Sequence, residues 1–296
     1  MSPRNDAPGW IVVVPVKSLT GAKTRLAPEL GPAERAALAR AFALDTIDAA
    51  RAARAVRRVV VVSDEPVVER ELRGVPGVDV VPEFGPRGLA AAIAHGIAVA
   101  RAAAPPTLPS TAPAIETSRM QGAARHPGRF DETAEAREEA ASGADGAVAV
   151  LLGDLPAMGP DDLDAALEAA ARHPLAFVAD AEGTGTTLAT ALAGVPFTAH
   201  FGPDSAARHR AAGFADLVAL EPRAIAPGLR RDVDTAGELR EAIALGVHVR
   251  TAEVVGGLGD RVDLADGAAP RHPLDPSTAP TGAATAPHGA DRKAAS

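Results

Sequence analysis

The chain has 296 residues, of which 47% are hydrophobic, and this allows a sizeable core in one large domain or two small ones. Its formal net charge of −8 and pI of about 5.5 argue against a nucleic-acid binder, because such a protein needs a basic face to displace counterions. The complete lack of cysteine excludes disulfides, thiolate metal sites and a cysteine nucleophile.

The first half of the chain predicts strands that alternate with helices. A continuous β-branched run at residues 10–16 is typical of a strand buried on both faces in a parallel sheet. Pro32 opens an alanine-rich helical pattern that runs to about residue 53, and a second buried strand follows at 59–62. The same alternation then predicts a helix at 66–72, a strand at 78–81, a helix at 89–102 and a strand at 147–152.

The second half continues this pattern. We expect a helix near 161–171, a strand at 175–179, a helix near 205–212 and a last helix after Thr235. Such alternation indicates a three-layer α/β fold with a doubly wound, mostly parallel sheet.

Two stretches fall outside this pattern. Residues 104–143 and 257–296 are rich in Pro, Ala, Ser, Thr and charge, with little apolar periodicity. We therefore expect a single domain over residues 1–256 that carries a disordered insertion, followed by a disordered tail.

The segment PVKSLTGAKTRL at 15–26 is the first candidate for chemistry, because ligands of open α/β sheets bind where the strands end. It holds Lys17 and Lys23, two of only three lysines in the chain, together with Arg25. These cations could wrap a triphosphate while Gly21 lets backbone amides approach it. A solvated basic loop is the alternative interpretation, since short motifs of this kind also arise by chance.

Two aspartate motifs predict a metal site. LLGDLPAM at 151–158 delivers Asp154 at the end of an apolar strand, where a carboxylate can hold Mg²⁺ against nucleotide phosphates. A helix cap is the alternative, but Asp154 lies several positions too early for it. In RRDVDT at 230–235, Asp232 and Asp234 alternate and therefore share one face of an extended segment. We expect one to bind metal, preferably Asp232, and the other to cap the following helix.

Two glycine-rich turns carry hydroxyl groups: GTGTT at 183–187 and FGPDS at 201–205. Ser205 could cap the helix that follows it, and free amides at a helix start can bind an anion. Ordinary turns and a cap would explain the pattern equally well; a site for a phosphorylated acid is the sharper hypothesis.

Taken in order, these motifs resemble the 2-phospho-L-lactate or phosphoenolpyruvate guanylyltransferases of coenzyme F420 biosynthesis. The resemblance covers about residues 10–250, apart from the insertion, and implies a nucleotide-diphospho-sugar transferase-like (Rossmann-like) fold. It implies that the phosphate of either acid attacks the α-phosphorus of GTP, with Mg²⁺ as cofactor, releasing pyrophosphate. Acid-binding positions of the family look like Thr187, Gly202 and Ser205, and its magnesium-binding aspartates look like Asp154 and the Asp232/Asp234 pair.

The nucleophile of this reaction is already ionised, so catalysis rests on alignment and charge neutralisation, which we assign to Lys17, Lys23 and Arg25. Gly88 is a further nucleotide-binding candidate. Where the family has Gly-Leu-Asn, however, this chain has Ala90, which leaves its purine selectivity open.

Several alternatives remain open from the sequence. Either acid could be the acceptor, and a nucleotidyltransferase for another cofactor or sugar phosphate, or a catalytically silent nucleotide-binding protein, would share much of the pattern. We expect a cytoplasmic protein without membrane or nucleic-acid partners, because no apolar run is long enough to span a bilayer and residues 1–9 lack a signal-like apolar stretch. The pathway also suggests transient docking with the transferase of the next step.

Overall fold

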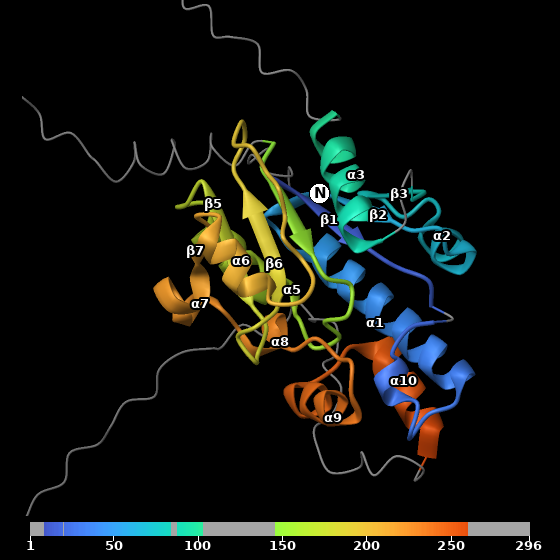
Figure 1. The fold of residues 1–296 in the computed structure, drawn as a ribbon. Helices are drawn as coiled ribbons and strands as arrows, with labels where there is room; N and C mark the ends of the chain where they lie inside the picture. Colours follow the sequence, from blue (N-terminus) through green and yellow to red (C-terminus); the bar gives the residue numbers. More distant parts are fainter. Residues whose placement is uncertain (1–8, 20, 84–87, 103–145, 260–296) are drawn as a thin grey trace, which may run out of the picture.

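The computed structural model describes residues 9–19, 21–83, 88–102 and 146–259 (Figure 1). The insertion expected at 104–143 lies outside these ranges, as do residues 260–296 of the expected tail. None of the helices that the structure describes combines the length and the apolar character needed to cross a bilayer.

Within the described residues, seven strands form one sheet in the order β3-β2-β1-β4-β6-β5-β7. Their bounds are Trp10–Pro15 for β1, Val56–Val62 for β2, Val78–Val81 for β3, Val148–Leu151 for β4, Leu175–Ala179 for β5, Thr186–Ala191 for β6 and Ala215–Asp216 for β7. Every neighbouring pair is parallel except those made by β6, which runs antiparallel to β4 and β5. The expected mostly parallel sheet is confirmed.

The helices begin largely where the sequence predicts them. They are α1 (Pro32–Ala52), α2 (Pro66–Leu72), α3 (Leu89–Ala102), α5 (Pro160–Ala170), α6 (Ser205–Ala211), α7 (Leu217–Leu220), α8 (Pro227–Arg230), α9 (Ala236–Leu245) and α10 (Val249–Leu258), with short 3-10 turns η1 (Thr24–Leu26) and η2 (Pro222–Ala224). Four of these helices, α1, α2, α5 and α8, start on proline, whose fixed φ suits the first turn and whose missing N–H is not needed there.

Alternating side chains of β1 build the two halves of the core. Val12 and Val14 pack with residues of α1 and α5 on one face, and Ile11 and Val13 pack with α3 and α6 on the other. Figure 1 shows these helices on opposite faces of the sheet, which confirms the three-layer α/β arrangement. Gly96 permits a close approach of α3, because a side chain there would clash with Val13 of β1.

A third apolar cluster joins α1, α9 and α10 to the turn η1. Asp45 of α1 is buried and accepts hydrogen bonds from the backbone N–H groups of Arg250 (3.3 Å) and Thr251 (2.8 Å) at the start of α10. Leu26 of η1 is completely buried in the same cluster. Packing of α9 and α10 therefore fixes η1 and the basic loop that leads into it.

The sequence did not predict β6, β7, α7, α8, α10 or the turns η1 and η2, and of these β6 and α10 bear on the site. Strand β6 lies where we expected only a glycine-rich turn, because its sequence TTLATA lacks the β-branched apolar run of the other central strands. Helix α10 was not predicted because VRTAEVVGGL contains two adjacent glycines, Gly256 and Gly257, where the expected tail starts. Both elements contribute to the site, the first directly and the second by holding η1.

Candidate functional site

Lys23 links two of the aspartates that the sequence singled out. Its side chain is 8% exposed, and its Nζ donates to Asp154 Oδ2 at 2.6 Å and to Asp234 Oδ1 at 2.9 Å. Burial by itself would lower the pKa of Lys23, but the charges of the two carboxylates outweigh it and raise the pKa above its ordinary value. One cation thus holds together the loop after β1, the loop after β4 and the segment before α9.

Asp154 follows β4 at the carboxyl edge of the sheet. While its Oδ2 accepts from Lys23, its Oδ1 is buried and has no hydrogen-bond partner among the described residues. The next residue is fixed by a hydrogen bond from the Leu155 N–H to Thr46 Oγ1 at 3.1 Å. A buried carboxylate oxygen without a donor is costly unless a cation or another donor reaches it.

Asp232 and Asp234 lie on the segment between α8 and α9. Val233 between them is completely buried in the third apolar cluster. Burial, followed by the negative charge of Asp154, Asp180 and Asp234, raises the pKa of Asp232 to about 7. Four aspartates therefore meet closely enough that one of them resists ionisation.

The helix cap expected from this aspartate pair is wrong. Thr235 is the N-cap of α9, and its Oγ1 accepts from the Glu238 N–H at 3.3 Å. The Glu238 carboxylate in turn accepts hydrogen bonds from the N–H groups of Asp234 (2.6 Å) and Thr235 (2.7 Å), which completes a capping box. Both aspartate side chains are left for the site.

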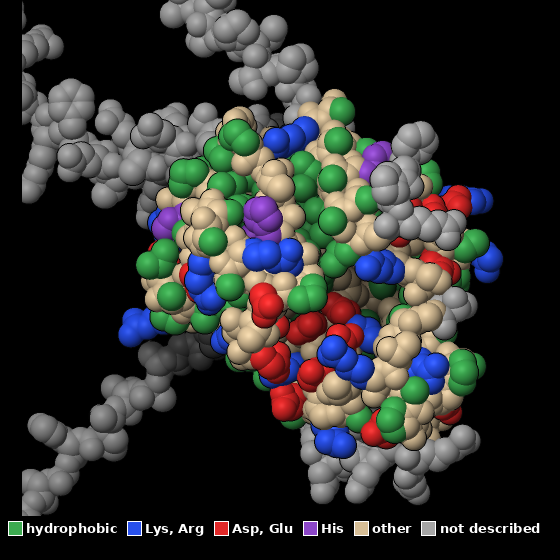
Figure 2. Space-filling view, in the orientation of Figure 1, with side chains coloured by type: hydrophobic (Ala, Val, Ile, Leu, Met, Phe, Trp, Pro, Cys, Tyr) green, Lys and Arg blue, Asp and Glu red, His purple; other side chains and the backbone are tan. Residues whose placement is uncertain are grey.

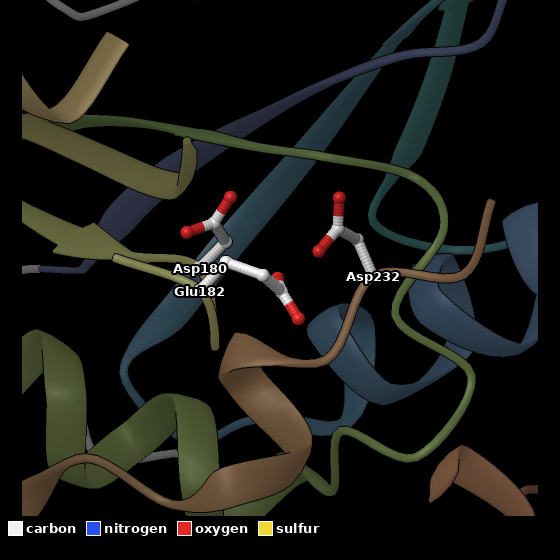
Figure 3. Close-up of side chains that lie close together, drawn as sticks. All are labelled: Asp180, Glu182 and Asp232. Atoms are coloured by element: carbon white, nitrogen blue, oxygen red, sulfur yellow. The ribbon is translucent and has the colours of Figure 1, made fainter. Parts of the chain in front are cut away.

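A second acidic group was missed by the sequence analysis. Asp180 and Glu182, from the loop after β5, lie beside Asp232 (Figure 3), and each of the three offers a carboxylate oxygen within 4.8 Å of the others. This acidic triad could hold a metal ion. Asp180 directly follows the strand β5, and Asp154 follows β4 after two intervening residues, so the repeated pattern of an apolar strand followed by aspartate is the signal that could have found it.

Two residues of this triad, Asp180 and Glu182, also make contacts that stabilise the local structure. Asp180 accepts backbone N–H groups of Thr184 (2.9 Å) and Gly185 (2.7 Å), and a side chain at position 185 would clash with its carboxylate. Glu182 pairs with Arg231 at 2.6 Å. Asp180 thereby shapes the GTGTT turn that precedes β6.

The remaining basic candidates are more accessible. Lys17 is exposed after β1, and the side chain of Arg25 is 73% exposed, with one nitrogen 3.8 Å from Asp234 Oδ2. Gly88 adopts φ 134° just before α3, next to residues 84–87, which the structure does not describe. Figure 2 shows acidic side chains gathered over α8 and the segment leading to α9, with basic side chains at their border. Of the three loop cations, Lys23 alone is buried.

The candidates for acid binding come from two neighbouring segments. Thr187 in β6 is fully buried, and its Oγ1 has no partner among the described residues. Gly202 lies in the turn before α6 with φ 110°, and Ser205 is the buried first residue of that helix. The N-cap position is Asp204, so the capping role expected for Ser205 is wrong. A hydrogen bond from the Ala206 N–H to Thr184 O (3.0 Å) joins the two segments.

Lysine, arginine and four aspartates thus converge at one edge of a mostly parallel sheet, beside a buried unpaired hydroxyl. Carboxylate oxygens that could hold a cation, next to long basic side chains, suit the phosphates of a nucleotide, and the fold and site therefore favour the class of nucleotidyltransferases.

Comparison with known proteins gives the family. Residues 10–133 match the family model described as "Guanylyl transferase CofC like". A phosphoenolpyruvate guanylyltransferase of Thermomonospora curvata is 44% identical over 243 residues, covering 82% of this chain and 87% of the relative. One of Sanguibacter keddieii is 43% identical over 276 residues, covering 83% and 84%. The chain therefore belongs to this family of guanylyltransferases.

Among solved structures, a proposed nucleotide-diphospho-sugar transferase from Desulfovibrio desulfuricans aligns with a TM-score of 0.44 at 17% identity, over 80% of this chain and 96% of that one.

Proposed function

We propose that the protein transfers GMP from GTP to phosphoenolpyruvate, giving enolpyruvyl-diphospho-5'-guanosine and pyrophosphate in coenzyme F420 biosynthesis. The observation that carries the proposal is the Lys23 bridge between Asp154 and Asp234 at the carboxyl edge of the sheet. The names of the relatives, which are about 40% identical to the chain over most of its length, favour phosphoenolpyruvate over 2-phospho-L-lactate as the acceptor.

The acidic residues fit Mg²⁺. The cluster offers carboxylate oxygens, the ligands that this hard cation prefers, and the buried Asp154 Oδ1 lacks any other partner among the described residues. We assign the ion to Asp154 and Asp232, whose charges act on each other, with Asp234 as the further candidate ligand. Asp232 also belongs to the acidic triad with Asp180 and Glu182, which could contribute oxygens to the same ion. When bound, the ion would neutralise charge on the triphosphate and on the departing pyrophosphate.

The basic loop supplies the other charges. The acid's phosphate oxygen forms a bond to the α-phosphorus of GTP as the bond from that phosphorus to the β-phosphate oxygen breaks. Because the attacking phosphate is already ionised, no side chain has to remove a proton. Lys17 and Arg25 are exposed and free to reach the triphosphate, while Lys23 acts from a fixed position.

The acid is assigned to Thr187, Gly202 and Ser205. The unpaired Thr187 hydroxyl supports this assignment, since a donor left alone in the interior gains most from a ligand oxygen. A Cβ added at position 202 would lie 3.3 Å from Arg208 Nη2, so a side chain there would crowd the guanidinium group.

Gly88 is assigned to the nucleotide, and guanine selectivity has to be measured because this chain has Ala90. A cytoplasmic location and transient docking with the next transferase complete the proposal.

Pyrophosphate release tests the proposal directly. Purified protein is mixed with Mg²⁺, GTP and either phosphoenolpyruvate or 2-phospho-L-lactate, and the nucleotide product is identified by mass spectrometry. We expect pyrophosphate and the phosphoenolpyruvate adduct. ATP, CTP and UTP in place of GTP measure base selectivity. No pyrophosphate with either acid would overturn the proposed function.

A further inference from the structure

His209 of α6 is fully buried and has no part in the mechanism proposed above. Its ring stacks on Phe177 of β5 with 5.5 Å between ring centroids, and the edges of Phe201 and Phe214 close around it at 5.6 Å and 4.8 Å. A buried imidazole in such surroundings is usually neutral, and burial indeed lowers the pKa of His209 to about 4. Each ring nitrogen must then find a suitable partner.

The hydrogen bonds of the ring settle which nitrogen carries the proton. Nε2 lies 3.0 Å from the backbone N–H of His200 and can only accept from it, so Nε2 is unprotonated. The proton is therefore on Nδ1, which donates to Ser205 O at 2.9 Å and lies 3.0 Å from Thr186 Oγ1. One neutral ring thus contacts three separate places in the chain.

Those three places are the segments that carry the acid-binding candidates. Thr186 is the chain neighbour of Thr187, His200 stands two residues before Gly202, and Ser205 is itself a candidate. We propose that His209 is a positioning residue for the phosphorylated acid: it sets the spacing of β6, the turn before α6 and the start of α6, without touching the substrate. The inference rests on the proposed function and adds to it a residue that the motifs did not indicate.

Three substitutions separate the interactions. His209→Asn keeps a donor near Nδ1 but loses the acceptor for the His200 N–H, whereas His209→Gln keeps an acceptor near Nε2 but loses the donor to Ser205. Thr186→Val leaves the ring in place and removes one partner. As a matched control, Thr190→Val removes a buried hydroxyl of the same strand, which bonds Ala176 O at 3.3 Å away from these segments.

Steady-state kinetics with GTP and phosphoenolpyruvate provide the readout. We expect both His209 variants to raise the KM for the acid on the order of tenfold and Thr186→Val to raise it on the order of threefold, with the KM for GTP almost unchanged. The Thr190 control should change neither KM. A role in packing alone would lower the melting temperature without this split between substrates.

The outcomes are distinguishable. If wild-type protein transfers GMP to neither acid, the proposed function is wrong. If it does, but the variants that fold keep the wild-type KM for the acid or raise both KM values alike, the positioning role is wrong. If the His209 variants fail to fold, Thr186→Val tests the positioning role in the same assay, since that variant keeps the imidazole ring of His209.

Discussion

Lys23 Nζ lies 2.6 Å from Asp154 Oδ2, although the two residues are 131 positions apart in the chain. The same nitrogen contacts Asp234, so the lysine is the common counter-ion of two carboxylates that we assign to the metal site. A lysine in this position is not a freely moving phosphate ligand. It neutralises the aspartates, and a divalent cation that binds them must share or take over that task.

Replacing Lys23 with Met should therefore destabilise the protein in a metal-dependent way. In EDTA we expect a loss on the order of 2–3 kcal/mol, which is below the usual value for a broken buried pair because Asp234 is half exposed. Mg²⁺ should restore much of the loss by replacing the missing charge. Thermal unfolding in EDTA and in Mg²⁺ measures both effects, with Lys17→Met as the exposed control. An equal loss in both buffers would show that Lys23 acts independently of the metal.

Asp154→Asn should abolish turnover while the fold survives. Asparagine keeps the volume of the side chain but removes the charge, and we expect kcat to fall at least about a hundredfold. The control is Asp79→Asn. Asp79 lies on the edge strand β3, which is distant from the site in the sheet, and the substitution removes its charge from an ion pair with Arg58. Pyrophosphate release by both variants is the measurement. Turnover near the wild-type level in the Asp154 variant would refute the metal assignment.

The raised pKa of Asp232 predicts a pH dependence of stability. Between pH 3.8 and about 7 the folded, metal-free protein keeps a proton that the unfolded chain has released, because burial of this carboxyl group, followed by the negative charges of Asp154, Asp180 and Asp234, raises its pKa. Through that window the free energy of unfolding should fall as the pH rises, by up to about 1.4 kcal/mol per unit. Asp232→Asn should remove this contribution.

Urea unfolding in EDTA at pH 5, 6 and 7 measures the effect in both proteins. A bound divalent cation favours the carboxylate, so metal binding at pH 6 should release a proton, and its affinity should rise with pH. Identical slopes in the wild type and the Asp232 variant would show that another group holds the proton.

The parallel strands β1, β2 and β4 and the main helices could be predicted from the sequence, and the antiparallel strand β6 could not. Strand β1, residues 59–62 of β2 and strand β4 are buried and appear as apolar runs rich in valine, and proline marks the start of α1 and α5. The strand β6 lies between β4 and β5 in space yet follows both in the chain. Its short threonine and alanine side chains fit a crowded sheet centre, but they do not produce a strand pattern.

The site shows the same limit. Asp154, Asp232 and Asp234 could be found because each stands at the end or edge of a clear element. The Lys23 bridge depends on packing of η1 against α9 and α10, contacts between residues more than two hundred positions apart, and no local pattern encodes them. The GTGTT sequence close to Asp180 is typical of a turn and does not indicate a role for this aspartate, whose carboxylate holds that turn together.

Thr187 offers a test in which stability and function should move in opposite directions. Its buried hydroxyl has no partner among the described residues, so Thr187→Val removes a polar group that costs free energy in the folded state. We expect unfolding free energy to stay level or rise by about 1 kcal/mol. If the hydroxyl binds the acid, however, the KM for phosphoenolpyruvate should rise on the order of tenfold.

Thr187→Ser is the complementary variant, because it keeps the hydroxyl and loses the buried methyl group. It should lower stability by about 1 kcal/mol and leave the KM for the acid close to the wild-type value. Thermal unfolding and pyrophosphate kinetics on the two variants therefore separate packing from recognition. If the valine variant binds the acid as well as the wild type, Thr187 does not contact the substrate, and the acid site must be sought nearer Ser205 and the start of α6.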